Sequence, residues 1–483
     1  MARLVGRDPE RAVLNAALTS ETGEGELIAV YGRRRVGKTF LVREFFGARL
    51  CFELVGIHGA RRDVQLEAFG AALQRATGRA VVTPPTDWYG AFRLLEGFLA
   101  DRLRRRRGKV VVLLDELPWL ASRKSGFLEA FGHFWNTFGS RQGRLVVVLC
   151  GSAASWMIEH VVHERGGLHN RVTRRLRVEP FALPDVEALL RSRGVDLTRP
   201  QVVELAMALG GVPHYLAQVE RGESSAQAID RLCFSRDGLL RSEFPNLFAS
   251  LFEQAHRHEA VVRALATRRK GLGRTELLRH ARLESGGAAT AVLQELEEAG
   301  FIHQLPALGQ VRRDARFWLS DESVLFFLSW VVSHRGDAAG SWLRRQGTPA
   351  WRAWAGLAFE AMCLKHVRAI KRALGIAGVE SVEASWAHQG SDQTDGAQVD
   401  LVIDRADRCM NLCELKFAQG PFVIDKAYAA ELRRKRDVFQ AATRTRKALF
   451  LTLVTTHGVK PSAWARELVA REVTVDALFE RAS

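Results

Sequence analysis

Three stretches of the chain consist almost entirely of apolar residues, and each is followed at once by polar or glycine residues. They are residues 27–31 (LIAVY), 110–114 (VVVLL) and 145–150 (LVVVLC). Continuous apolar runs of this length are typical of strands that are buried on both faces of a parallel sheet. Residues 40–46, after the first run, are compatible with a helix. The pattern therefore predicts an α/β fold built on a parallel sheet.

The residues that link the first strand to this helix form a phosphate-binding motif. Residues 32–39 read GRRRVGKT, which matches G-x-x-x-x-G-K-T between a strand and a helix. In such a loop the backbone N–H groups turn inward around the phosphates, the lysine reaches the β and γ oxygens, and the threonine hydroxyl binds Mg²⁺. The residues predicted to bind ATP are Gly32, Arg33, Arg34, Arg35, Val36, Gly37, Lys38 and Thr39.

Acidic residues that complete the metal site follow the second apolar run. Asp115 and Glu116 come directly after it. An aspartate in this place holds Mg²⁺ through water, and a neighbouring glutamate orients the attacking water. We therefore predict Thr39 and Asp115 as metal ligands and Glu116 as a catalytic residue. The pair favours hydrolysis of ATP over binding alone.

Two further positions are candidates for contact with the transferring phosphate. Ser152 follows the third apolar run, where a polar side chain can sense the γ-phosphate, although an ordinary turn serine explains it nearly as well. Arg171 lies in the arginine-rich segment 168–175 and is our candidate for stabilising the transferring phosphoryl group. It can act within one subunit or across an interface, which leaves room for an oligomer.

Beyond the third run the pattern becomes helical. The turn at 210–216 (GGVPHYL) interrupts it and predicts a helical lid over the nucleotide base. Residues 261–319 then predict three helices and a hairpin with a basic turn at 312–313, which together make a winged helix. Such a module reads DNA through its recognition helix and wing. An interaction or hinge module is an equal alternative, because the presumed recognition helix lacks Arg and Lys and carries Gln294, Glu295, Glu297 and Glu298.

The C-terminal third combines two carboxylates with an ammonium group. Asp400 and Glu414 lie in two strand-like segments joined by a turn at 405–408. Alternation places Glu414 and Lys416 on one face of their strand, where Asp400 can join them. Such a group can bind Mg²⁺ or Mn²⁺, activate water and offset the charge of a phosphate. The helix predicted at 424–440 carries four consecutive basic residues that can line a phosphate backbone.

The composition of the chain indicates a class of binding partner and a cellular compartment. The net charge of +16 indicates an anionic partner, and we expect nucleic acid, DNA rather than RNA. The basic run at 102–107 is explained equally well by the C-terminal end of a helix. The six cysteines contain no C-x-x-C pair, so neither a disulfide framework nor a zinc site is indicated. The N-terminus lacks a signal peptide, and no apolar stretch approaches the roughly 20 residues that span a bilayer. We expect a cytoplasmic protein with no membrane association.

Several of these segments, in this order, resemble the archaeal-type ATPases of the AAA+/STAND assemblage, which also occur in bacteria. The segments are LVGR at 4–7, YGRRRVGKT at 31–39, VVLLDELPWL at 111–120, LCGSAASWM at 149–157 and GGVPHYL at 210–216. The resemblance implies that Lys38, Thr39, Asp115 and Glu116 bind nucleotide and metal, and that Pro213 touches the nucleotide from the lid. The family usually carries Gly-Arg where this chain has Asn170-Arg171.

The C-terminal segment resembles the PD-(D/E)xK nuclease core. Asp400, Glu414 and Lys416 occupy the strand positions of that core, and Val399 replaces its usual proline. The resemblance implies that Glu360, within the helix predicted over 351–370, is a further acid and metal ligand. The ATPase family often carries a nuclease-like region in this place.

Together these predictions describe four domains. They are a P-loop ATPase core at 1–180, a helical lid at 181–250, a winged helix at 251–335 and a nuclease-like α/β domain at 340–483. Two functions fit this arrangement. In the first, an ATPase is coupled to a metal-dependent DNA nuclease. In the second, the chain is a STAND-type switch whose C-terminal domain binds a partner and cuts nothing. The intact acids and lysine favour the first reading, and the acidic recognition helix favours the second.

Overall fold

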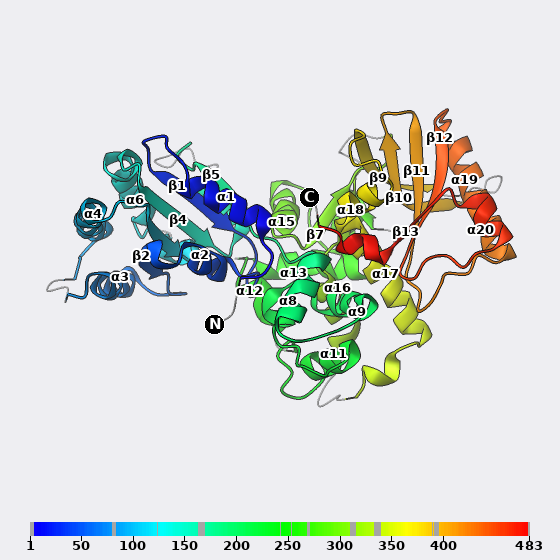
Figure 1. The fold of residues 1–483 in the computed structure, drawn as a ribbon, viewed down its shortest axis with the longest axis horizontal. Helices are drawn as coiled ribbons and strands as arrows, with labels where there is room; N and C mark the ends of the chain where they lie inside the picture. Colours follow the sequence, from blue (N-terminus) through cyan, green and yellow to red (C-terminus); the bar gives the residue numbers. More distant parts are fainter. Residues whose placement is uncertain are drawn as a thin grey trace. The chain divides into compact units, whose positions relative to one another are not determined.

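The chain forms two compact units. The computed structural model describes residues 4–79, 84–122, 124–162, 170–241, 243–252, 254–267, 271–309, 315–332, 340–388, 390 and 396–481. The first unit comprises Met1–Glu179 and Ser250–Glu253, and the second comprises Pro180–Ala249 and Gln254–Ser483. Figure 1 traces the chain through both. The finer division into four domains remains a prediction.

The first unit is built on a five-stranded parallel sheet with the strand order β2-β3-β4-β1-β5. The strands are β1 (Glu26–Tyr31), β2 (Leu50–Val55), β3 (Val110–Asp115), β4 (Leu145–Gly151) and β5 (Arg174–Arg177). The three apolar runs are β1, β3 and β4, which are the inner strands of the sheet. The predicted α/β fold with a parallel sheet is therefore confirmed.

Helices cover both faces of this sheet (Figure 1). Successive residues of β1 show the two faces, because Leu27 packs into one apolar cluster and Ile28 into the other. The first cluster is closed by α3 (Arg62–Thr77), α4 (Trp88–Arg105) and α6 (Phe127–Thr137). The second is closed by α1 (Asp8–Leu18) and α2 (Lys38–Phe46). Shorter helices are α5 (Leu117–Leu120) and α7 (Ala154–Met157).

Two arginine-rich segments of this unit have structural roles. The segment 168–175, which contains Arg171, runs into the edge strand β5 at residue 174. Arg174 makes an ion pair with Glu26 at 3.1 Å. Charged side chains are a common way to protect a sheet edge. The run at 102–107 lies at the C-terminal end of α4, and Arg104 and Arg105 both pair with Asp101. The helix-end interpretation accounts for this run.

The second unit begins with helices and continues into a small antiparallel sheet. The helices are α8 (Leu183–Ser192), α9 (Arg199–Leu209), α10 (Pro213–Leu216), α11 (Ser225–Cys233), α12 (Glu243–Ala249), α13 (Ala255–Ala266), α14 (Arg274–His280) and α15 (Gly287–Glu298). The sheet has the order β6-β8-β7, with β6 (Leu272–Gly273), β7 (Ile302–Leu305) and β8 (Arg316–Leu319). Three helices and a hairpin thus follow one another as predicted. The basic turn at 312–313 lies outside the described residues.

A second five-stranded sheet, with the order β13-β12-β11-β10-β9, forms the C-terminal part of this unit. Its strands are β9 (Ser381–His388), β10 (Ala397–Arg405), β11 (Cys409–Lys416), β12 (Ala448–Thr455) and β13 (Arg471–Thr474). The first three pair antiparallel, and β11, β12 and β13 pair parallel. Its helices are α16 (Glu322–Phe326), α17 (Pro349–Lys365), α18 (Val367–Ala373), α19 (Lys426–Thr443) and α20 (Ala463–Leu468).

Two predicted helices have different bounds in the structure. The helix predicted over 351–370 is two helices, α17 and α18, because His366 leaves helical geometry and its ring bonds to the Met362 carbonyl at 2.8 Å. The helix predicted at 424–440 begins only at Lys426, where the Asp425 side chain accepts from the Tyr428 N–H at 2.8 Å. None of the helices within the described ranges is long and apolar enough to cross a bilayer.

Candidate functional site

The phosphate-binding loop between β1 and α2 requires glycine at both of its motif positions. Gly32 has φ 145°, and a Cβ atom there would lie 2.2 Å from the carbonyl oxygen of Val178. Gly37 has φ 91° and stands directly before the first residue of α2. Both conformations are ones that side-chain-bearing residues rarely adopt. The loop backbone is therefore free to turn its N–H groups toward the N-terminal end of α2, where an anion is favoured.

Lys38 is buried at the head of this loop. Its Nζ donates to the carbonyl oxygens of Gly32 at 2.8 Å and Arg33 at 3.0 Å, and to the Ser152 hydroxyl at 3.1 Å. Burial lowers the pKa of Lys38, and the nearby Glu116 and Asp115 act against that shift. The ammonium group thus bonds to protein oxygens that the phosphate oxygens of a bound nucleotide are expected to replace.

Thr39 and Asp115 form the pair that is predicted to hold Mg²⁺. The Thr39 hydroxyl donates to Asp115 Oδ2 at 2.7 Å, and Asp115 Oδ1 accepts from the backbone N–H of Glu116 at 2.9 Å. Thr39 lies on α2, which follows β1, and Asp115 ends β3. Strand β4 lies between β1 and β3, yet both side chains meet at the carboxyl edge of the sheet. A hydroxyl and a carboxylate are hard oxygen donors of the kind that Mg²⁺ uses together with substrate phosphates, so these residues fit the ion.

Ser152 connects Lys38 to the predicted catalytic base. Besides accepting from Lys38, the Ser152 hydroxyl donates to Glu116 Oε1 at 2.8 Å. The backbone of Glu116 is left-handed, with φ 49°, and Ser152 is buried at the end of β4. Lys38, Ser152 and Glu116 therefore form one hydrogen-bonded chain beside the Thr39–Asp115 pair.

The structure adds Arg7, to which the residue analysis had assigned no role. Its guanidinium donates to the carbonyl oxygens of Val36 and Glu179, both at 2.7 Å, and to the Glu10 carboxylate at 2.7 Å. Val36 belongs to the phosphate-binding loop, so Arg7 fixes the loop from behind. A lone arginine before a helix carries no sequence signal for such a contact.

Two other residues, Arg171 and Pro213, were predicted to contact the nucleotide. Arg171 is exposed and precedes β5, and no hydrogen bond or ion pair joins it to the parts of the chain that the structure describes. Pro213 begins α10 and belongs to the second unit. Their roles as transition-state and lid contacts remain predictions. Of the remaining loop residues, Arg33 is buried, and Arg34 and Arg35 are half-buried.

A second charged cluster lies in the C-terminal sheet. Lys416 Nζ is 3.1 Å from Asp400 Oδ2 and 3.0 Å from Glu414 Oε2. Asp400 also accepts from the Leu415 N–H at 3.0 Å. A shift in register between Val399 and Val402 on β10 accompanies this arrangement. Bulges of this kind re-aim side chains and are over-represented beside active sites.

A second lysine, Lys435 of α19, also contacts this cluster. Its Nζ lies 2.8 Å from Glu414 Oε2, and the Tyr428 hydroxyl lies 3.4 Å from the same oxygen. One neighbour in the basic run is also engaged, because Arg433 pairs with Glu467 at 2.7 Å. The prediction that this run faces a phosphate backbone must therefore be corrected for these two residues, whose charges are used within the domain.

The electrostatics of the cluster follow from its burial. Burial and the nearby Asp400 raise the pKa of Glu414, while Lys416 and Lys435 act against that shift. Burial works to lower the pKa of Lys416, but Asp400 and Glu414 outweigh it and raise the pKa. Two carboxylates and two ammonium groups thus balance each other in a site that little water reaches.

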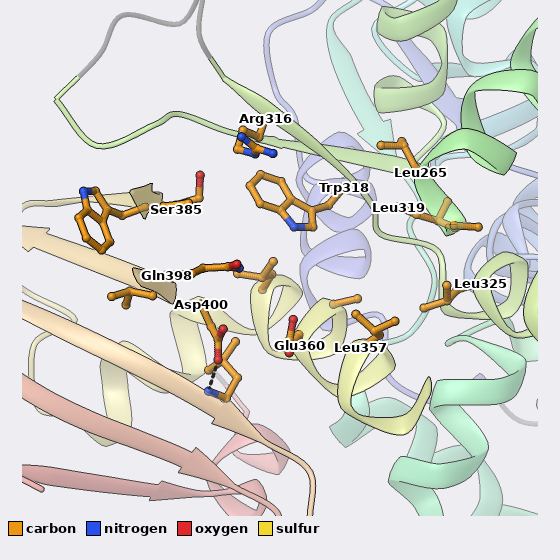
Figure 2. Close-up of a pocket in the computed structure, with 17 residues that line it drawn as sticks. Leu265, Arg316, Trp318, Leu319, Leu325, Leu357, Glu360, Ser385, Gln398 and Asp400 are labelled. Carbon is orange, nitrogen blue, oxygen red and sulfur yellow. Dashed lines mark hydrogen bonds between the residues drawn. The ribbon is translucent and has the colours of Figure 1, made fainter. Parts of the chain in front are cut away.

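Glu360, the third predicted acid, lies on α17 and lines the same cleft as Asp400 (Figure 2). Within the described ranges no three carboxylate, histidine or cysteine side chains lie close enough together to hold one ion. Asp400 and Glu414 therefore fit a divalent cation as a pair of oxygen donors, and Glu360 lies on the same side of the cleft as Asp400 without completing a three-ligand cluster among the described residues.

A known family profile matches the N-terminal part of the chain. Residues 8–219 match the profile of a family described as an ATPase domain predominantly from Archaea. An uncharacterized protein of Methanocaldococcus jannaschii is 24% identical over 343 residues, which are 68% of this chain and 68% of that protein.

Two solved structures are similar at low identity. The Walker-type ATPase of Pyrococcus abyssi is 16% identical, with 68% of this chain and 97% of that chain covered and a TM-score of 0.49. The ORC2 protein of Aeropyrum pernix, solved in ADPNP and ADP complexes, is 16% identical, with 68% and 93% covered and a TM-score of 0.42.

Proposed function

We propose that residues 8–219, which match the profile of an ATPase domain predominantly from Archaea, bind and hydrolyse ATP. The observation that carries the proposal is the contact of Thr39 with Asp115 at 2.7 Å beside the buried ammonium of Lys38. These groups come from two segments that lie far apart in the sequence, the start of α2 and the end of β3, and each has the chemistry that phosphoryl transfer requires at that place.

The residues of this site divide the work of hydrolysis. Lys38 exchanges its carbonyl acceptors for the β and γ oxygens of ATP. Thr39 and Asp115 would hold Mg²⁺, which would supply positive charge to those oxygens when bound. Glu116 accepts the proton of the attacking water, and Ser152 gives up its bond to Glu116 for one to the γ-phosphate. Glu116→Gln keeps the shape of the side chain and removes its basicity.

The test compares ATP binding and turnover in the wild type, Glu116→Gln and Lys38→Ala. Glu116→Gln is expected to bind ATP as the wild type does and to turn over about a hundredfold more slowly. Lys38→Ala is expected to lose binding as well, whereas Lys124→Ala, which removes an exposed lysine of the same unit, changes neither. Full turnover in Lys38→Ala contradicts the proposal.

For the C-terminal domain we propose a metal-dependent DNA nuclease. The supporting observation is that Lys416 lies within 3.1 Å of both Asp400 and Glu414, which pairs two possible metal ligands with a cation for the scissile phosphate. In this proposal the small module of α13–α15 and its antiparallel sheet is a winged helix that presents DNA to this site. The proposal is also compatible with an oligomer in which Arg171 acts across the interface.

A nucleotide-controlled switch without nuclease activity is the second candidate. Lys435 supports it, because a second ammonium on Glu414 balances the cluster without a metal. Glu295 of α15 supports it too, since it is bound to His258 at 2.6 Å and cannot serve as a free DNA contact. Plasmid cleavage with Mg²⁺ or Mn²⁺, with and without ATP, decides between the two when the wild type is compared with Asp400→Ala.

A further inference from the structure

The C-terminal cluster opens into a cleft that also borders the small antiparallel sheet of the same unit. Figure 2 shows Arg316 and Trp318 of β8 on one side and Asp400 and Glu360 on the other. The two sides are tied together at Ser385 of β9. The Ser385 N–H donates to the Pro306 carbonyl, and the Leu308 N–H donates to the Ser385 carbonyl, both at 3.1 Å. The cleft is thus a fixed feature within one unit.

We propose that this cleft holds one unpaired nucleotide of a nucleic-acid strand beside the phosphate presented to Asp400 and Lys416. The inference rests on the proposed nuclease function for what happens at the phosphate, but the binding of the nucleotide stands on the cleft alone. Unpaired bases have free flat faces and a polar edge, and proteins bind them by stacking on aromatic rings and by hydrogen bonds to that edge.

Trp318 supplies the flat apolar surface. Gly271, with φ 60°, lies against its indole ring so closely that a Cβ atom at Gly271 would stand 2.6 Å from the ring carbon Cε2. The glycine therefore lets the ring rest on the backbone and fixes its orientation. A ring held in this way stacks on a base without first losing side-chain freedom, which is a cost that flexible contacts carry.

Ser385 and Gln398 supply the polar edge. Ser385 is 6% exposed and lines the cleft, and its hydroxyl has no hydrogen-bond partner within the described part of the chain. A buried hydroxyl without a partner costs about 1–3 kcal/mol, so its place in the cleft calls for a ligand with a donor or acceptor. The Gln398 amide, in the same lining, offers both (Figure 2).

The spacing along β10 connects this pocket to the reacting phosphate. Gln398 precedes Asp400 by two residues on the strand, a rise of about 6–7 Å. This is about the distance from a base to the phosphate of a neighbouring nucleotide. Arg316, at the edge of the cleft, adds a positive charge for the backbone. The guanidinium donates to the Gly271 carbonyl at 2.9 Å, which anchors it.

The test measures the binding of the full-length chain to labelled DNA hairpins in EDTA, so that cleavage cannot contribute. The hairpins carry a blunt end, a short single-stranded tail, or the same tail with an abasic unit, and an RNA tail separates the contribution of the sugar. We expect the tail with bases to bind about tenfold tighter than the abasic tail, the range given by stacking on one aromatic ring.

Substitutions of cleft residues test whether the preference for the base-containing tail arises in the cleft. Trp318→Ala is expected to remove the tenfold preference, and Trp318→Phe to keep most of it. Gln398→Ala and Ser385→Ala, which leave the Trp318 ring in the chain, are expected to reduce the preference about threefold to fivefold. They carry the test if Trp318→Ala does not fold. Arg279→Gln removes an exposed charge of α14 outside the cleft and should leave the preference unchanged.

Two results overturn the inference. One is equal binding of base-containing and abasic tails, and the other is a preference that survives Trp318→Ala and Gln398→Ala. The outcome is separable from that of the nuclease proposal. A preference that needs Trp318 in a chain that cuts nothing supports the cleft and removes the nuclease. Cleavage that ignores Trp318 and Gln398 supports the nuclease and removes the cleft.

Discussion

The hydroxyl of Ser152 donates a hydrogen bond to Glu116 Oε1 at 2.8 Å, and the oxygen of that Ser152 hydroxyl accepts from Lys38 Nζ at 3.1 Å. The first of these bonds fixes the orientation of the Glu116 carboxylate. Lys38 is the group that ATP is expected to draw toward its phosphates. The three side chains thus couple occupation of the phosphate-binding loop to release of the proposed base.

Ser152→Ala removes the middle of this chain. We expect its kcat for ATP hydrolysis to fall about tenfold, since the γ-phosphate loses one oriented donor, while its Kd for ATP stays within about twofold of the wild type. Turnover assays and fluorescent-nucleotide titration measure the two quantities. Ser192→Ala, an exposed serine at the end of α8, is the control. A rise in Kd as large as the fall in kcat would assign Ser152 to binding instead.

Arg7→Leu tests whether the loop is positioned from behind. The change removes three hydrogen bonds, including those to the carbonyl oxygens of Val36 and Glu179. Leaving buried acceptors without donors costs about 2–3 kcal/mol, so we expect a lower Tm. Loosening of the loop should also weaken ATP binding about tenfold. Arg11→Leu is the matched control, since Arg11 lies on α1, the helix that Arg7 precedes, and its half-exposed side chain pairs with Asp8 at 3.4 Å.

A lowered Tm with unchanged ATP affinity would show that Arg7 supports the fold and not the loop. Saturating ATP sharpens the comparison, because a ligand stabilises the folded state in proportion to its affinity. The gain in Tm on adding ATP should be smaller in Arg7→Leu than in Arg11→Leu.

The inner strands of the first sheet were predictable because burial on both faces makes their sequences apolar without interruption. Edge strands follow no such rule. β5 reads RRLR, and only Leu176 of the four is buried, since the strand faces solvent along one side. The arginine-rich segment 168–175, which runs into this strand, was interpreted as a source of phosphate contact through Arg171, whereas Arg174 of the same segment pairs with Glu26. Charge in a sequence does not say whether the partner is a ligand or a neighbouring strand.

Contacts between distant segments mark the other limit of prediction. The spacing of Asp400, Glu414 and Lys416 predicted two neighbouring strands, and the structure places the three side chains together. Lys435 and the register shift beside Asp400 had no signal, because each depends on how a helix or a third strand packs against the pair. Residue types and their spacing in the sequence indicate the chemistry of a site, whereas tertiary packing determines the balance of charge within it.

His366 predicts a dependence of stability on pH. Its Nδ1 bonds to the Met362 carbonyl at 2.8 Å, and its Nε2 accepts from the Leu183 N–H at 3.3 Å, which requires the neutral ring. Burial lowers the pKa of His366, and Lys365 adds to the effect, although Met362 and Glu322 oppose it. Below the unfolded-state pKa of about 6.5 the unfolded chain binds a proton that the folded chain resists.

The contribution of His366 is therefore complete above about pH 6.5 and is lost as the pH falls toward the lower folded-state pKa, by up to about 1.4 kcal/mol per pH unit. Apparent Tm values between pH 5 and pH 8 measure it. His366→Gln retains an acceptor for Leu183 and has no titrating ring, so its Tm should fall less on acidification than that of the wild type. Equal slopes for both proteins would mean that other groups, such as His303, account for the acid sensitivity.

Lys435→Gln tests whether a lysine competes with a metal for Glu414. The Lys435 ammonium lies 2.8 Å from Glu414 Oε2, so a divalent cation that binds Glu414 must displace it. Removing the ammonium removes the competitor and lets Glu414 offer its full charge. We expect Mn²⁺ to bind about tenfold tighter in Lys435→Gln than in the wild type, a difference of about 1.4 kcal/mol. Titration followed by the Mn²⁺ EPR signal measures this difference in affinity directly.

Lys447→Gln is the control. It breaks another lysine–carboxylate pair of the same sheet, with Asp404, and should leave Mn²⁺ affinity unchanged. If Mn²⁺ binds equally to the wild type and Lys435→Gln, and Asp400→Ala binds it no less tightly, then Asp400 and Glu414 do not hold the ion, and the switch without nuclease activity becomes the better account of this domain.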